Sequence, residues 1–202
     1  MAKIKLTKTE LKAQTDALKR YQRFLPMLQL KKQQLQMEIA AIVAKAEDVA
    51  ARESALRGDI GRWVGLLATD ESLVDGLVTV KGVHTGTANI AGVAIPTFES
   101  IDTDVREIDP WETPAWLDAV ASAAGKILSL RCERTVYDEQ RRLVSEELQR
   151  TSQRVNLFEK VKIPECREAI RVIKIALGDE QTAAVARGKI AKSRSPEEEA
   201  SA

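Results

Sequence analysis

Residues 11–67 read LKAQTDALKRYQRFLPMLQLKKQQLQMEIAAIVAKAEDVAARESALRGDIGRWVGLL, and apolar side chains recur along them at two positions of a seven-residue repeat. The first position holds Leu11, Leu18, Leu25, Ile39, Ala46, Ile60 and Leu67, and the second holds Tyr21, Leu28, Leu35, Ile42, Val49, Leu56 and Trp63. A 3.5-residue period sustained over about eight heptads is typical of a helix in a left-handed coiled coil. We therefore predict one helix, about 85 Å long at 1.5 Å per residue.

A helix with one apolar seam needs a partner, and residues 114–192 offer a second long helical pattern. Its apolar positions are Leu117, Val120, Ala124, Ile127, Tyr137, Val144, Leu148, Thr151, Val155 and Phe158, and then Ile163, Cys166, Ile170, Ile173 and Leu177. The second group is one residue out of phase with the first, which predicts a local change of winding near Pro164. The simplest fold is mainly α, a long antiparallel two-helix coiled coil.

The first helix carries a clear start signal and several irregularities. Thr7 and Glu10 form a capping box that predicts a helix over residues 8–68. Pro26 should kink or break this helix, because proline removes an amide donor and crowds the preceding turn. Lys32 and Glu53 place charges in the seam, either to fix register, which we favour, or to contact a third partner. Three glycines, Gly58, Gly61 and Gly65, either admit a close-packed neighbour or mark fraying.

Between the two helices, the helical period disappears and β-prone runs replace it. Residues 77–83 and 93–98 read as two strands, with turn signals at residues 85–87 and 89–92, so we predict a small β-hairpin. Because an isolated two-stranded hairpin is marginal in water, it should pack on the coiled coil or on another protein. We nevertheless expect the helix seam not to depend on these strands. Residues 99–112 are acidic and read as a loop.

The start of the second helix and the end of the chain complete the predicted organisation. Thr113 as N-cap, Pro114 at the first helical position and Trp116 in the first turn are strong start signals. The last residues form a Ser-Pro-Glu tail that we expect to be disordered. The predicted segments are an N-terminal helix (1–68), a hairpin and acidic loop (69–113), a C-terminal helix (114–192) and a disordered tail (193–202).

Composition excludes several kinds of partner. The 31 Lys and Arg balance 30 Asp and Glu, so no field of one sign favours nucleic acid or an acidic membrane surface. No apolar run approaches the roughly 18 residues that span a bilayer, so we expect no direct membrane insertion. Cys132 and Cys166 are too few and too far apart for a metal-ligand cluster, and we expect a reducing compartment, the cytoplasm.

The sequence offers no catalytic, cofactor-binding or metal-ligating constellation, and we do not expect an enzyme. His84 has no Cys, Asp or Glu at a useful spacing and reads as a surface histidine. Gly82, Gly86 and Gly92 lack the GK[ST] sequence of a phosphate loop and read as turn glycines. Cys166 lies on the apolar stripe and reads as a small core residue. Three tryptophans, Trp63, Trp111 and Trp116, read as packing at the junction with the hairpin.

Two stretches resemble a known family. Residues 89–99, NIAGVAIPTFE, look like the hairpin signature of the D subunit, the central rotor shaft of V-type and A-type rotary ATPases, and residues 154–164, RVNLFEKVKIP, resemble its second signature. The residues that carry the match are Asn89, Gly92, Val93, Pro96, Arg154, Val155, Asn156, Glu159, Ile163 and Pro164. The chain departs from the family near its end, where Gly178 and residues 183–186 dilute a charged segment, so the length of the last helix is open.

The resemblance implies a non-catalytic central-stalk subunit without a cofactor, in a complex peripheral to the membrane on its cytoplasmic side. Its paired termini would lie inside the hexamer of catalytic A and B subunits, with the F subunit along its side. The C subunit, called d in eukaryotes, would link it to the membrane rotor ring. Rotation would couple ATP synthesis or hydrolysis to proton or sodium ion transport. The alternative is a free-standing coiled-coil adaptor or tether, which would share the heptads but not the β insertion.

Overall fold

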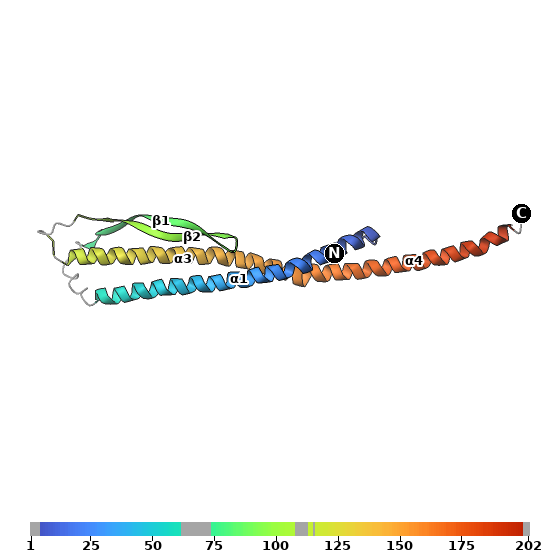
Figure 1. Ribbon diagram of the computed structural model, residues 1–202, viewed down its shortest axis with the longest axis horizontal. Coiled ribbons are helices and arrows are strands. Elements are labelled where there is room, and N and C mark those ends of the chain that lie inside the picture. The colour runs from blue at the N-terminus through green and yellow to red at the C-terminus, as the bar shows by residue number, and fades with distance from the viewer. Residues whose placement is uncertain (1–4, 62–73, 108–112, 115, 200–202) are drawn as a thin grey trace. The chain divides into compact units, whose positions relative to one another are not determined.

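The computed structural model describes residues 5–61, 74–107, 113–114 and 116–199 (Figure 1). Helix α1 spans Lys8–Gly61, strands β1 and β2 span Val78–Ile90 and Val93–Val105, and helix α3 spans Leu117–Leu157. A five-residue π-helix, Phe158–Lys162, joins α3 to helix α4, Ile163–Glu199. The predicted fold class, mainly α with a β-hairpin insertion, is confirmed.

The described residues divide into two compact units. The central unit consists of residues 31–150, and the terminal unit consists of residues 1–30 together with residues 151–202. Both units therefore combine chain from each side of the hairpin. The division into four consecutive segments follows the order of the sequence and stays a prediction.

The predicted seam of α1 is confirmed over its described length. All seam residues between Leu11 and Ile60 are buried or half-buried, and Leu35, with none of its surface exposed, is the most deeply buried. The sequence predicts a kink or a break at Pro26; α1 continues through it, so a break is wrong, while a kink stays a prediction. Leu25 and Leu28 on either side of the proline are both half-buried, and this packing holds the helix where one amide hydrogen bond is lost.

Two of the three glycines near the end of α1, Gly58 and Gly61, lie in the described helix. The described helix ends at Gly61, and residues 62–68 of the predicted helix, Gly65 included, lie outside the described residues. A Cβ atom built at Gly58 or Gly61 would meet no other atom within 4 Å. No neighbour from the described chain packs closely on these two glycines, and the choice between a close-packed neighbour and fraying stays a prediction.

Ion pairs show how the helices run in the central unit. Lys31 Nζ lies 2.8 Å from Glu147 Oε1, whereas the later residue Arg52 pairs with the earlier residue Glu133 at 3.5 Å. Residue numbers rise along α1 as they fall along α3, so the two helices are antiparallel here, as predicted. The hairpin lies along α3 in the same unit (Figure 1).

The hairpin is longer than the sequence predicts. Strands β1 and β2 contain 13 residues each and pair antiparallel from Val78 opposite Val105 to Ile90 opposite Val93. The predicted acidic loop is therefore wrong through Val105, while residues 108–112 lie outside the described residues. Cationic side chains of β1 pair with acidic side chains of β2, and in one such pair Lys81 Nζ lies 3.0 Å from Asp104 Oδ1. Pairs of opposite charge across two strands stabilise a ladder that faces solvent.

Two predicted turn glycines lie within a strand. Gly82 and Gly86 both belong to β1, so the turn expected at residues 85–87 is wrong, and only Gly92 of the three occupies a turn. At Gly86 a Cβ atom would come within 2.5 Å of Glu99 Oε1 and 2.8 Å of Thr97 Oγ1. Glycine at this position leaves room for the Thr97 and Glu99 side chains of β2 and does not reverse the chain.

Both ends of the second helical region differ from prediction. Helix α3 begins at Leu117, whose amide donates to the Pro114 carbonyl across 3.0 Å, so Pro114 belongs to a preceding turn and the predicted start is wrong. Trp116 packs beside this start as expected, while Trp63 and Trp111 lie outside the described residues. Helix α4 runs to Glu199 and so includes residues 193–199 of the tail expected to be disordered.

Candidate functional site

The first signature builds the turn of the hairpin. Ala91 and Gly92 connect the strands with φ of 50° and 84°, and positive φ at both central residues defines a type I′ turn. The amide of Gly92 donates to Asn89 Oδ1 across 2.9 Å. Glycine takes this backbone conformation without steric cost, and the asparagine side chain closes the turn. The two signature residues therefore determine local geometry.

The same signature docks the hairpin on both helices of the central unit. Ile95 is only 3% exposed and forms a core cluster with Leu35, Ile42 and Val144. Around it pack Ile39, Ile90, Ala91, Val93, Tyr137 and Leu148, and we call the whole set the tip core. Gln140 Nε2 of α3 donates to the carbonyl oxygen of Pro96 across 2.6 Å. The expectation that the helix seam is independent of the strands is therefore wrong at the tip core.

A second cluster fastens the other end of the hairpin to the start of α3. Its buried members are Leu77, Leu117, Val120 and Ala121, and Val74, Val78 and Trp116 pack against them. We call this set the base core. The amide of Arg106 also donates to the Leu77 carbonyl across 3.0 Å, which ties the two strand ends together. The expectation that the hairpin packs on the coiled coil is confirmed at both ends.

The second signature contains the change of winding. In the π-helix Phe158–Lys162 the amide of Ile163 donates to the carbonyl of Phe158, one residue farther back than in an α-helix. This geometry inserts one extra residue immediately before Pro164, which has no amide to donate. Val155 and Ile163 are 5% and 7% exposed and both lie on the inner face of the terminal unit. A regular heptad would bring the residue seven positions after Val155 to this face, but the extra residue of the π-helix brings Ile163 there instead. The predicted one-residue phase jump is confirmed.

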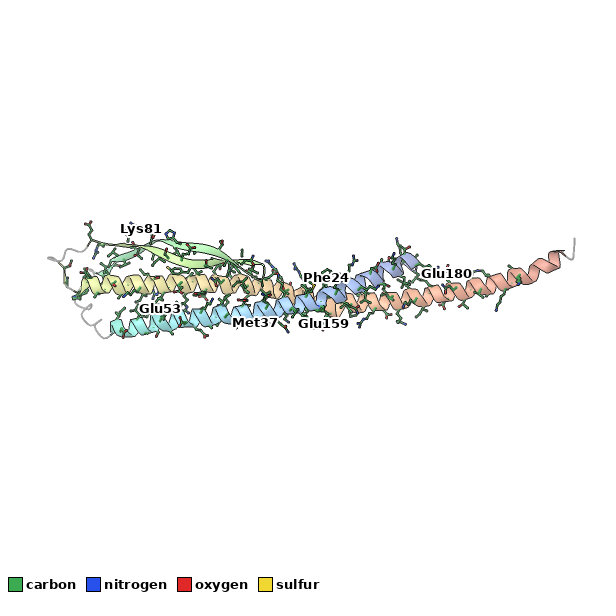
Figure 2. All side chains as sticks on the ribbon, in the orientation of Figure 1. Phe24, Met37, Glu53, Lys81, Glu159 and Glu180 are labelled. Atoms are coloured by element: carbon green, nitrogen blue, oxygen red, sulfur yellow. The ribbon has the colours of Figure 1, made fainter. Side chains whose placement is uncertain are left out.

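The remaining residues of the second signature face outward. Arg154, Asn156, Glu159 and Pro164 are all exposed, and Figure 2 labels Glu159 within the π-helix. On the inner side, the rings of Tyr21 and Phe158 lie 5.0 Å apart between centroids. The second signature thus divides into buried residues that hold the helices together and exposed residues that contribute no core packing. The first signature belongs to the central unit and the second to the terminal unit.

Glu53 is the charged residue buried in the α1 seam. It is 7% exposed, and its Oε1 accepts hydrogen bonds from Arg131 of α3 at 3.0 Å and from Arg57 at 2.7 Å. The hydrogen bond from Arg131 holds the pKa of the Glu53 carboxyl below its usual 4.5, although burial opposes this effect. A buried carboxylate paired across the seam tolerates little sliding of one helix past the other, which favours the register interpretation.

His84 has a partner that sequence spacing did not reveal. Its Nε2 lies 2.7 Å from Asp102 Oδ2 because β1 and β2 bring together residues 18 positions apart. This hydrogen bond raises the pKa of His84 above 6.5. The side chain is 55% exposed, so the prediction of a surface histidine is confirmed while its lack of a partner is wrong.

Neither cysteine forms a disulfide. Cys166 is 6% exposed on the inner face of α4, where burial raises the pKa of its thiol, and its prediction as a small core residue is confirmed. Cys132 of α3 is half-buried. Across the described residues, no group of three or more His, Cys, Asp and Glu side chains could hold a metal ion. Within these same ranges, no helix has the length and apolar character needed to cross a membrane.

The fold and its signatures define a coiled-coil protein in which a hairpin and a π-helix adapt two long helices to one another. Residues 10–193 match the model of the family described as the ATP synthase D subunit. The chain belongs to this family of ATP synthase D subunits.

Curated relatives named as D subunits of V-type ATP synthase match almost the full chain. The relative from Borreliella burgdorferi is 45% identical over 193 residues, covering 96% of this chain and 95% of the relative. The relative from Chlamydia muridarum is 34% identical over 198 residues, with 96% of each chain covered. That from Chlamydia felis is 32% identical over 197 residues, covering 96% of this chain and 94% of the relative. Family membership places the chain among the components of an ATP synthase complex.

Proposed function

We propose that this protein is the non-catalytic central rotor shaft of a V-type ATP synthase or ATPase. Its rotation couples ATP synthesis or hydrolysis in a hexamer of catalytic A and B subunits to the transport of protons or sodium ions. The complex is peripheral to the membrane on the cytoplasmic side, and the shaft itself does not enter the bilayer. The observation that carries this proposal is the family match over residues 10–193, which covers both helical regions and the hairpin between them.

The packing and the ion pairs between the helices support a mechanical role. Both signatures contribute to packing and backbone geometry, and cross-helix pairs such as Arg131–Glu53 at 3.0 Å resist sliding of α1 against α3. A shaft must keep its two helices in register while it transmits torque, because slippage would dissipate the work. A shaft that keeps its helices in register can present different faces to successive catalytic sites as it turns, without catalysing any step itself.

The same proposal assigns partners to surfaces. The terminal unit lies inside the A and B hexamer, while the F subunit binds along the side of the shaft and the C subunit, called d in eukaryotes, connects it to the membrane rotor ring. We assign the exposed residues of the second signature, Arg154, Asn156 and Glu159, to contacts with a neighbouring protein of the complex. Their exposure supports this assignment, since residues that contribute no core packing to the chain are available to a partner.

Purification from native membranes tests the shaft role. A tagged full-length chain should recover the A and B subunits together with ATP hydrolysis activity. A free-standing coiled-coil adaptor or tether, which is the competing function, would recover other proteins and no hexamer. Recovery of the chain without A and B subunits under conditions that keep the hexamer intact would refute the shaft.

Substitution of the exposed signature residues tests the assigned contacts. The triple variant Arg154→Ala, Asn156→Ala and Glu159→Ala should lower the yield of assembled complex or its coupled ion pumping, with helix content unchanged. Gln153→Ala is the matched control, because Gln153 is exposed on the same helix and lies outside the signature. Equal assembly and pumping for both variants would remove these residues from the interface.

A further inference from the structure

The hairpin is packed tightly at its two ends and loosely between them. Ile95 in the tip core is 3% exposed and Leu77 in the base core is 2% exposed. Between these anchors, Val80 and Val83 of β1 are 37% and 42% exposed. We call residues 79–85 and 99–104 the arch. Both valines are only partly covered, while Ile101 of β2 is half-buried.

Two cavities, both largely open to solvent, lie between the hairpin and α3. The first has a volume of about 370 Å³ and is lined by Ile101, Thr103 and Val105 of β2 and by Ala121, Gly125 and Ser129 among the residues of α3. The second, also about 370 Å³, is lined by Val83, Thr85 and Pro96 from the hairpin and by Cys132, Val136 and Glu139 from α3. Since about 10–15 Å³ of such space admits one water molecule, each has room for several.

The strand ladder is interrupted in the arch and not in the tip. Register shifts fall between Val80 and Gly82 and between His84 and Thr85, which leaves Lys81 and Glu99 as the extra residues of two β-bulges. From Thr85 opposite Phe98 to the turn, the pairing proceeds without a shift. Bulges bend a strand pair and weaken its ladder locally. The arch therefore has space between it and α3, and its strand pair bends more easily than the strand pair of the tip.

We propose that the arch is a strap that closes onto α3 while the tip core and the base core stay fixed. The structure holds the raised form. Closure removes the second cavity, buries Val83 against Val136 and covers the thiol of Cys132. Closure would bury the apolar side chain of Val83 against Val136 and release water from both. The one carboxylate of this lining, Glu139, already pairs with Arg142 at 2.6 Å.

The native thiol of Cys132 makes closure measurable. In the full-length chain with Cys166→Ala as background, Val83→Cys places a second thiol on the opposite side of the second cavity. A disulfide requires Cα atoms about 4.4–6.8 Å apart, so formation of the bond reports a close approach of the arch to α3. Lys81→Cys is the control, since this exposed residue of the same strand (Figure 2) does not line the cavity. Thr85→Cys, also in the lining, serves if Val83→Cys fails to fold.

Hydrogen exchange then distinguishes a moving strap from a static one. In the reduced protein, amides of the arch should exchange at least about tenfold faster than amides of the tip, because local opening is cheaper where packing is poor. Mild oxidation should link Cys132 to the new thiol faster than in the Lys81→Cys control, and the link should slow exchange in the arch while leaving the tip unchanged. Oxidation no faster than in the control, or a disulfide that leaves exchange in the arch unaltered, would overturn the proposal.

Discussion

At Gly92 the backbone conformation itself favours glycine over any other residue. Its φ is 84°, and a Cβ built there would meet no atom within 4 Å, so a side chain would be penalised by backbone strain alone. We expect Gly92→Ala to lower the free energy of unfolding by about 1–2 kcal/mol. Gly125→Ala in α3, where a Cβ is equally unhindered, should raise it by up to about 1 kcal/mol. Urea unfolding of the full chain measures both, and losses of equal size would contradict the strain argument.

Glu53 ties stability to pH. Its pKa in the folded chain lies below 4.5, so its contribution is fully present above the unfolded-state pKa and is lost as pH falls through the folded-state value. We expect Glu53→Gln to lower the free energy of unfolding at neutral pH and to have progressively less effect in acid.

An exposed carboxylate provides the comparison for Glu53. Glu139, whose pKa the Arg142 hydrogen bond also lowers, is 42% exposed, and Glu139→Gln should cost less than Glu53→Gln at neutral pH. Thermal unfolding of both variants across the acid range gives the result. A loss in Glu53→Gln that is independent of pH would mean that packing, and not the Arg131 pair, accounts for its effect.

At the scale of elements, the hairpin tip contributes to the pairing of the helices. Ile95→Ala should lower the free energy of unfolding by about 2–5 kcal/mol, because it opens a cavity between β2, α1 and α3. Val83→Ala, a truncation on the neighbouring strand, should cost under about 1 kcal/mol, because Val83 is 42% exposed. Denaturant unfolding with cross-linking between α1 and α3 as a second probe tests both. If both variants lost a similar free energy of unfolding, Ile95 would not lie in a tightly packed core.

The π-helix makes a different kind of prediction. It inserts one residue, so deletion of the exposed Lys160 should leave a regular α-helix with Val155 and Ile163 on the same face. Pro164 would then lie inside that helix at a cost of about 3 kcal/mol, which Pro164→Ala removes. The deletion combined with Pro164→Ala should therefore unfold at nearly the wild-type temperature.

Deletion of a residue outside the π-helix is the control. Removing exposed Arg167, again with Pro164→Ala, rotates Ala169 and Ile173 by about 100° away from the inner face that Cys166 shares. This variant should melt well below the Lys160 deletion. Calorimetry compares the two, and equal melting temperatures would mean that the π-helix does not maintain the seam.

At the scale of the whole molecule, we expect the C-terminal part of α4 to contribute to function but little to stability. Residues 178–192 are exposed throughout, so truncation after Leu177 should change the free energy of unfolding by under about 1 kcal/mol. In the assembled complex the same truncation should abolish ATP-driven ion pumping in reconstituted vesicles, because the proposed shaft would lose the segment that transmits rotation.

Excision of residues 77–98 provides the opposite case. It removes Ile95 and the tip core, so it should destabilise the helix pair of the central unit even where the complex still assembles. Hydrolysis and pumping are measured for both deletions after every component of the complex is confirmed present. Intact pumping after truncation at Leu177 would refute the role proposed for this end of the chain.

The sequence by itself determined the features that repeat or act locally. The heptads identified the seam of α1 through Leu35 and Val49, the one-residue phase jump located the π-helix before Pro164, and Asn89 and Gly92 marked the turn. Periodicity shows which residues of a helix share a face, and turn chemistry depends on a few neighbouring residues, so both can be read without the fold.

Only the tertiary structure decided which residues meet across the sequence. The partner of Glu53 is Arg131, 78 positions away, and the partner of His84 is Asp102, 18 positions away. The acidic residues of β2 belong to a strand that pairs with β1 along its whole length, and Ile95 entered the core because the tip reached both helices. Each outcome depends on the register between segments, and register is set by the summed packing of the whole interface, which no local pattern contains.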